Sequence, residues 1–327
     1  MQQVLQSKDL LRTIVAYQNG LHPDVLPLAR FLSQIRLRQG HNDAEFRAFH
    51  RLIAPWLRVH GTAGLELFPT TLNGHLFYYS LALGNEMVLA FLHSKSALNL
   101  DDSDWELIIT YGHVQVLEFL LGHGYEGCSA DTMSQAIEAG QLDMVECLHK
   151  NGVETSKEAF NEACVNGHAQ IAQFLHQNSL SEWDPNTFMF VLVNGHLDIV
   201  QFLYENGYES FDSNTAFGFD VSGLDIVAKC GHLDVVEYLF DQKPRQSIEN
   251  AMVEAAKAGH LDIIKFLDGK QVTWKPVNVV TQAIKYNRLQ VVKYLLQSHQ
   301  AQMDKETLAN IARKHRRQSI LTFLQAA

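Results

Sequence analysis

The feature that most constrains the fold of this chain is a segment of about 28 residues that recurs along it. Residues 194–207 read NGHLDIVQFLYENG, residues 229–242 read KCGHLDVVEYLFDQ and residues 257–270 read KAGHLDIIKFLDGK. We take the glycine before the histidine as a marker; successive markers lie 27 to 29 residues apart, except for one step of 36. Such a period is typical of repeat architectures, in which each copy is one supersecondary unit. The markers are Gly84, Gly112, Gly140, Gly167, Gly195, Gly231 and Gly259, with Asn287 and Arg316 in the same position of two weaker copies.

Each copy predicts two short helices. A small or β-branched residue stands four positions before the marker and a larger apolar residue stands seven before it, which is the spacing of one helix face. Apolar residues at positions 2, 4, 5, 7 and 8 after the marker predict a second helix with a broad apolar face. The marker glycine is expected to end the first helix with a left-handed residue, and Gly124, Gly152 and Gly207 to end the second. We therefore predict an all-α array of helix–turn–helix repeats whose neighbours bury a continuous core.

Residues 255–260, AAKAGH, resemble the hallmark of the ankyrin repeat. The usual ankyrin period is about 33 residues and opens with Thr-Pro-Leu-His, whereas residues 131–134 here read DTMS and residues 250–253 read NAMV. Because the period is shorter, the β-hairpin fingers of ankyrin proteins are expected to be short or absent. The short repeat is similar to those of the large ankyrin families of oomycetes and amoebae. The resemblance implies an ankyrin-type solenoid, an interaction module or scaffold that binds a partner protein through its concave face.

The repeat grammar divides the chain into residues 1–73 and an array of about nine repeats over residues 74–327. Helices are expected over Asp9–Tyr17, Asp24–Arg38 and Asp43–Val59, and they are expected to form an N-terminal cap because solenoids need capped ends. Residues 9–17 and 24–31 also resemble the first two helices of an F-box, although its Leu-Pro opening and its later Trp are missing. This alternative implies a substrate-recognition subunit of a ubiquitin ligase, with the N-terminal helices docking on an adaptor.

Charge is distributed unevenly along the chain. The formal charge is +3 over residues 1–99, −21 over residues 100–269 and +8 over residues 270–327. The acidic middle argues against wrapping a nucleic acid and favours either a solvated surface or a partner protein with a basic segment. The basic C-terminal copy, Thr307–Leu324, is expected to be the second cap, with a docking or nuclear-import patch as the alternative. No apolar run reaches the length of a membrane span, so we expect a monomeric protein of the cytoplasm, with the nucleus as a second possibility.

Neither a catalytic nor a metal site is predicted. Residues 122–127 have the form GxGxxG, but they end a helix at a repeat junction, whereas a phosphate-binding loop follows a strand. Five of the sixteen histidines occupy the repeat marker, 27 to 36 residues apart, which is too widely spaced for one metal ion. The four cysteines form no Cys-x-x-Cys pair and are expected to be reduced thiols. We therefore expect no enzyme and no cofactor.

The candidate binding site lies in the middle of the array. Positions 6, 5 and 2 before the marker should project from the first helix toward the concave face, and in most copies they are polar. In the middle copies they are apolar, and an exposed apolar cluster often marks an interaction site. The 36-residue step places an insertion at residues 208–223, and insertions in repeat proteins often lie on the binding face. The predicted partner-binding residues are Met189, Phe190, Val193 and Ile226 on the helices and Phe211, Phe217 and Phe219 in the insertion.

Overall fold

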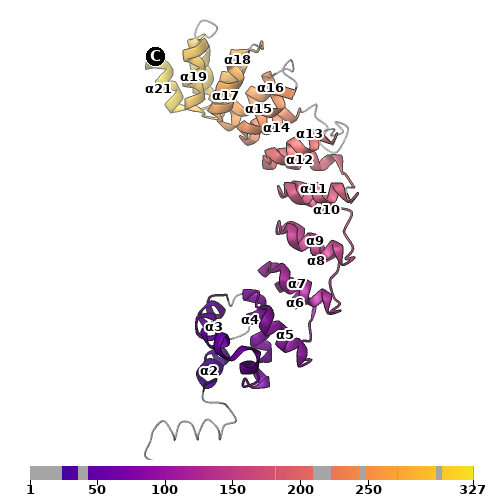
Figure 1. Ribbon diagram of the computed structural model, residues 1–327. Helices are drawn as coiled ribbons and strands as arrows, with labels where there is room; N and C mark the ends of the chain where they lie inside the picture. Colours follow the sequence, from indigo (N-terminus) through magenta and orange to yellow (C-terminus); the bar gives the residue numbers. More distant parts are fainter. Residues whose placement is uncertain are drawn as a thin grey trace, which may run out of the picture. The chain divides into compact units, whose positions relative to one another are not determined.

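The computed structural model describes residues 24–35, 43–180, 182–208, 222–242, 248–270, 272–299 and 304–326 (Figure 1). The chain divides into two compact units, Met1–Ser156 and Lys157–Ala327. Two helices and a short 3-10 turn precede three helix pairs in the first unit. Its elements are α2 (Leu26–Gln34), α3 (Asp43–Leu65), η2 (Thr70–Leu72), α4 (Asn73–Leu83), α5 (Glu86–Ser94), α6 (Asp102–Tyr111), α7 (Val114–Gly122), α8 (Ala130–Glu138) and α9 (Leu142–Lys150).

The second unit contains six helix pairs in its described residues. They are α10 (Ala159–Val165) with α11 (Ala169–Gln177), α12 (Pro185–Asn194) with α13 (Leu197–Glu205), α14 (Gly223–Cys230) with α15 (Leu233–Gln242), α16 (Glu249–Ala258) with α17 (Leu261–Asp268), α18 (Pro276–Lys285) with α19 (Leu289–His299), and α20 (Lys305–Lys314) with α21 (Gln318–Ala326). In each unit, every first helix packs on the first helix of the next pair, and every second helix on the next second helix. The predicted all-α repeat array is confirmed, and no strand occurs in the part of the chain that the structure describes.

The marker residue ends the first helix of each pair in the left-handed region, as predicted. The φ angle is 76° at Gly195 and 97° at Gly259. The two weaker copies keep this conformation without glycine, because Asn287 has a φ of 61° and Arg316 a φ of 56°. A left-handed residue lets the chain reverse at the helix end and satisfies carbonyls that would otherwise lack a partner. The sequence position, rather than the residue type, therefore defines the repeat.

The core of each repeat is built around the small residue four positions before the marker. This side chain is completely buried in every copy from the third to the ninth, which includes Ala136, Val191 and Ala255. A small side chain at this position allows successive first helices to approach closely. The second helix adds a buried apolar group, as Ile263, Ile264 and Leu267 do in α17. The two helix layers thus share one core within each unit.

The N-terminal helices pack on the first helix pair. α3 contacts both α4 and α5, and its Phe49 meets Tyr79 of α4 edge to face, with ring centroids 5.2 Å apart. His50 Nδ1 lies 2.7 Å from Tyr79 Oη. α3 keeps Pro55 in its interior and runs on to Leu65, beyond the predicted end at Val59, with a non-helical residue at Gly61. The predicted helix over Asp9–Tyr17 lies outside the described residues, and the boundary between residues 73 and 74 stays a prediction.

Candidate partner-binding surface

The first candidate residues lie on the outward side of α12. Pro185 opens this helix, and the side chain of Asp184 caps it by accepting a hydrogen bond from the backbone N–H of Asn186 at 3.0 Å. Thr187, Phe188, Val191 and Leu192 form its buried face, so the positions between them face outward. Phe190 is 49% exposed and Val193 is 42% exposed, whereas Met189 is half-buried.

The next first helix, α14, continues this apolar surface. α14 packs directly on α12, and Ile226 occupies the same position in its repeat as Phe190 does in the preceding one. Ile226 is half-buried, between the buried residues Asp225 and Val227. We call Met189, Phe190, Val193 and Ile226 the apolar patch. The other predicted site residues, Phe211, Phe217 and Phe219, lie outside the described residues.

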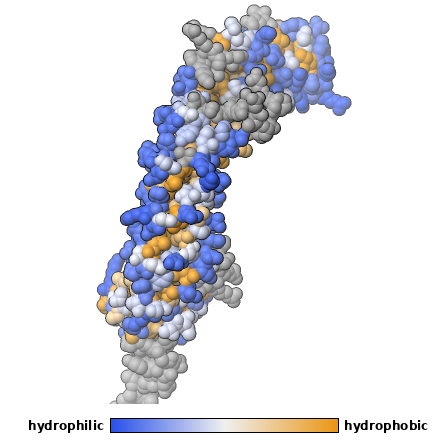
Figure 2. Space-filling view, turned by 90° about the vertical axis from the view of Figure 1, so that its right-hand side faces the viewer, coloured by the Kyte–Doolittle hydropathy of each residue, from blue (hydrophilic) through white to orange (hydrophobic). Residues whose placement is uncertain are grey.

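Polar residues flank the apolar patch along the second unit. The position of Phe190 is occupied by Glu162 in α10, by Glu254 in α16 and by Gln282 in α18. Glu254 pairs with Lys257, with Nζ and Oε1 2.5 Å apart. Figure 2 shows that, on the face turned to the viewer, hydrophobic residues form small groups among hydrophilic ones. An apolar residue at this position is therefore specific to the repeats of α12 and α14 among those that form the second unit's described part.

Hydrogen bonds between neighbouring repeats hold the turns at the edge of the apolar patch. His232 Nε2 donates to the carbonyl oxygen of Val193 at 2.8 Å, and Asn194 Nδ2 donates to that of Val165 at 2.8 Å. Val165, at position −2 of the preceding repeat, is apolar and half-buried. The sequence analysis missed it, although its position relative to Gly167 was enough to find it. A surface held in this way loses little conformational freedom when a partner binds.

The same interaction recurs along the array and explains the Gly-His pair. The residue after the marker reaches back to the carbonyl two positions before the preceding marker: His113 to Ala82 at 3.2 Å, His260 to Lys229 at 3.1 Å and Arg288 to Lys257 at 2.9 Å. The histidines are thus structural donors between repeats. The sequence showed their recurrence but not their partners, which lie 31 residues away in each of these three contacts.

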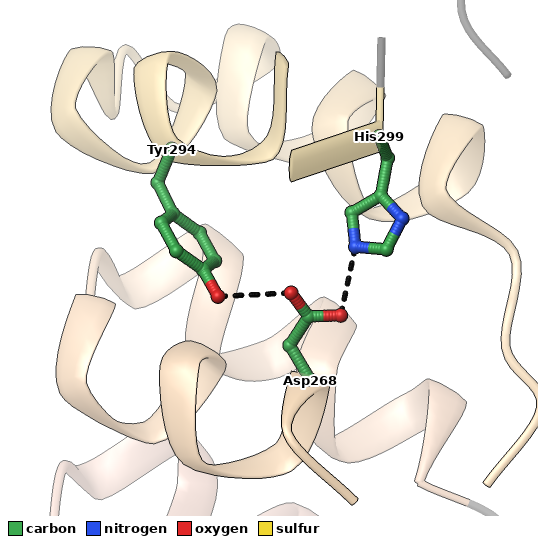
Figure 3. A network of polar contacts seen from close by, with 3 residues as sticks. All are labelled: Asp268, Tyr294 and His299. Atoms are coloured by element: carbon green, nitrogen blue, oxygen red, sulfur yellow. Dashed lines mark hydrogen bonds and ion pairs between the residues drawn. The ribbon is translucent and has the colours of Figure 1, made fainter. Parts of the chain in front are cut away.

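A second set of polar contacts joins successive second helices. Asp268, at the end of α17, accepts hydrogen bonds from two residues of α19, from Tyr294 Oη at 2.9 Å and from His299 Nε2 at 2.8 Å (Figure 3). The His299 ring also packs against Trp274, with centroids 5.0 Å apart. Burial, together with the hydrogen bond to Asp268, raises the pKa of Tyr294. These contacts cross-link two neighbouring repeats.

The titratable groups of the array point to structure rather than to nucleophilic chemistry. Burial raises the pKa of the Cys128 and Cys164 thiols to about 12, and it also raises the pKa of Cys147 and Cys230. A thiol with a raised pKa is a poor source of the reactive thiolate. Within the described ranges, no three His, Cys, Asp or Glu side chains are grouped as a metal site would require, and no helix has the length and apolar character to cross a membrane.

Comparisons with known proteins agree with the repeat architecture. The model of the family described as ankyrin repeats (3 copies) matches residues 133–215, 188–275 and 224–307, which together run without a gap over more than half of the 327 residues. No curated protein matches the sequence. Among solved structures, the crystal structure of the human ASB11 ankyrin repeat domain is similar, with 18% sequence identity and a TM-score of 0.41. This match covers 51% of the present chain and 83% of that chain.

Proposed function

Because the chain belongs to the ankyrin repeat family, we propose that it is a protein-binding module that recognises its partner through the apolar patch on α12 and α14. Ankyrin repeats generally serve as protein interaction modules. The observation that carries the proposal is the exposure of Phe190, which is 49% exposed at a position that is polar in the flanking repeats. Exposed apolar clusters ringed by polar residues mark interaction sites, and aromatic side chains are frequent anchors of binding energy.

The charge around the apolar patch supports a partner of mixed character. Residues 100–269 carry 7 Lys or Arg against 28 Asp or Glu. A negative surface attracts basic partners and accelerates their association. We infer that the partner segment combines apolar side chains, which would contact the patch, with basic residues around them. We further propose that the protein acts as a monomer in the cytoplasm or the nucleus.

Site-specific photo-crosslinking tests this function. We would place a photoreactive phenylalanine analogue at Phe190 or, as a matched control, at Val277, which is 45% exposed on α18. In lysate of the source organism, we expect discrete crosslinked proteins with the probe at position 190 and none of these with the probe at position 277. The additional substitution Val193→Asp should abolish the crosslinks without lowering the thermal midpoint. Equal crosslinking at both positions, or crosslinks that survive Val193→Asp, would contradict the proposal.

A second candidate function rests on α3. This helix buries Phe46, Phe49 and Ile53 against its neighbours but leaves Leu52 49% exposed and Val59 78% exposed. The buried face supports the role of a cap. The two exposed residues, seven positions apart and so on one side of the helix, support the alternative of an adaptor-docking subunit of a ubiquitin ligase. Affinity capture with the full chain and with its Leu52→Asp, Val59→Asp variant would decide between them. Recovery of cullin-complex subunits with the parent chain only would support the ligase function, and identical partner sets would leave a cap.

A further inference from the structure

The last two repeats carry an excess of positive charge. Residues 270–327 contain 10 Lys or Arg and 2 Asp or Glu. Many of the cations gather on two turns, the turn between α18 and α19 and the turn between α20 and α21. We call the exposed and half-buried residues of these turns the basic turn edge: Lys285, Tyr286, Arg288, Arg313, Lys314 and Arg316.

The cations of the basic turn edge have no carboxylate partners among the residues that the structure describes. The ion pairs found there involve Lys95, Lys157, Lys257 and His299. Lys257 stands at the same position of its repeat as Lys285 does in the next one, and it is neutralised by Glu254. The positive field therefore begins with the turn that follows α18. Charges of one sign on a surface attract ligands of the opposite sign over a distance of about 10 Å at moderate salt.

Hydrogen bonds to the backbone hold two of the guanidinium groups in this region. Arg288 Nε donates to the carbonyl oxygen of Lys257 at 2.9 Å. Arg317 donates to the carbonyl oxygen of Lys285 from Nε at 2.9 Å and from Nη2 at 2.6 Å, so it joins the two basic turns directly. An arginine has five N–H donors, so further donors remain for an anion. Arginines that are already oriented lose less entropy when they bind a carboxylate.

An aromatic side chain lies within the basic turn edge. Tyr286 is 53% exposed, between Lys285 and the left-handed Asn287. Tyrosine and arginine are the residue types most enriched at the centres of protein interfaces. This composition fits a peptide, which offers both carboxylates and apolar groups.

We propose that the basic turn edge binds a short acidic segment of a partner protein. A long nucleic acid fits less well, because duplex DNA carries a charge about every 1.7 Å and only two turns are basic, whereas residues 100–269 have a net charge of −21. A short acidic segment can stay within the two turns. The site shares no residue with the apolar patch, so it stands independently of the proposed function.

Fluorescence anisotropy with the full chain tests this site. The probe is a fluorescein-labelled twelve-residue peptide of alternating Glu and Gly around one central Phe. A peptide with Gln in place of Glu and a twelve-base-pair DNA duplex with the same label are the comparisons. We expect the Glu peptide to bind, the Gln peptide to bind at least ten-fold more weakly, and the affinity for the Glu peptide to fall as salt is raised.

Two variants of equal charge locate the site. In Arg313→Gln, Arg316→Gln, two exposed cations are removed from the basic turn edge, and we expect at least a five-fold loss of affinity for the Glu peptide. In Lys150→Gln, Lys229→Gln, two exposed cations are removed elsewhere, and affinity should stay within two-fold. Circular dichroism should show both variants folded. The proposal is overturned if the Glu peptide does not bind, if both variants weaken it equally, or if the duplex binds the same residues at least as tightly as the Glu peptide does.

Discussion

The marker glycine meets two steric requirements at once. Gly195 has a φ of 76°, which disfavours any side chain, and the imidazole of His232 from the next repeat lies where its Cβ would be. Gly207, at the end of the following helix, has the same φ of 76°, but nothing lies within 4 Å of a Cβ placed there. The two glycines therefore separate the backbone requirement from the packing requirement.

We expect Gly195→Ala to destabilise the protein more than Gly207→Ala. The left-handed conformation costs each alanine about 1–2 kcal/mol, and the forced shift of His232 adds about 1–3 kcal/mol for Gly195→Ala alone. Urea unfolding followed by circular dichroism measures both losses. Equal losses would show that the ring of His232 moves away freely and that packing plays no part in the choice of glycine.

Burial sets the titration of two neighbouring tyrosines. It raises the pKa of both Tyr78 and Tyr79 to about 12, and Tyr78 Oη also donates a hydrogen bond to Asp104 Oδ1 at 3.0 Å. In the unfolded chain both tyrosines would ionise near pH 10. Between pH 10 and pH 12 the unfolded state thus binds fewer protons than the folded state.

Stability should consequently fall as the pH rises from 10 to 12. The contribution of both tyrosines is fully present below pH 10 and is lost as the pH passes the raised pKa values. Urea unfolding at intervals across this range, with absorbance at 295 nm to follow tyrosinate, would measure the slope. The variant Tyr78→Phe, Tyr79→Phe should show a shallower slope, and an unchanged slope would assign the effect to other groups.

At the scale of the helix pair, the hydrogen bond from the residue after the marker holds one repeat on the next. Histidine and arginine fill this role at several turns. Gln141 occupies the equivalent position between the turns of α6 and α8, but its Oε1 is buried without a hydrogen-bond partner among the described residues. A buried polar atom without a partner costs about 1–3 kcal/mol.

Gln141→His should therefore stabilise the first unit by about 1 kcal/mol. The imidazole would pack on Gly112 and donate to the carbonyl oxygen of Thr110, as His113 does to that of Ala82 in the preceding repeat. The reverse change at an intact contact, His113→Gln, is the matched control and should lower stability by a similar amount. Thermal unfolding of both variants checks this. A loss of stability in Gln141→His would mean that the turn of α6 cannot accommodate the ring.

At the scale of the whole molecule, each repeat contacts its neighbours, and stability is close to a sum of repeat and interface contributions. A local change should thus act locally. We expect Gly195→Ala to accelerate amide hydrogen exchange in α12 to α15 and to leave α4 to α7 unchanged, as mass spectrometry of exchanged peptides would show. A uniform acceleration along the chain would instead indicate that it unfolds as one cooperative body.

Prediction from sequence succeeded where the determinants are close along the chain. The period of about 28 residues placed the helix pairs, and the repeat position of Phe190 and Val193 correctly predicted that they are exposed. The end of α3 was predicted too early, because Pro55 is accommodated inside the helix. The assignment of the apolar patch to partner binding stays a prediction, since exposure shows accessibility and not a ligand.

The sequence by itself determined the helical repeat, the left-handed marker and the buried small residue, because each depends on spacings of a few residues within one copy. Only the tertiary structure decided what lies between copies. The carbonyl that accepts from His232, the pairing of Asp268 with Tyr294 and His299, and the link from Arg317 to Lys285 join residues 26 to 39 positions apart. Such contacts exist only once the repeats stack, because stacking brings distant turns together and buries the polar groups that must then find partners.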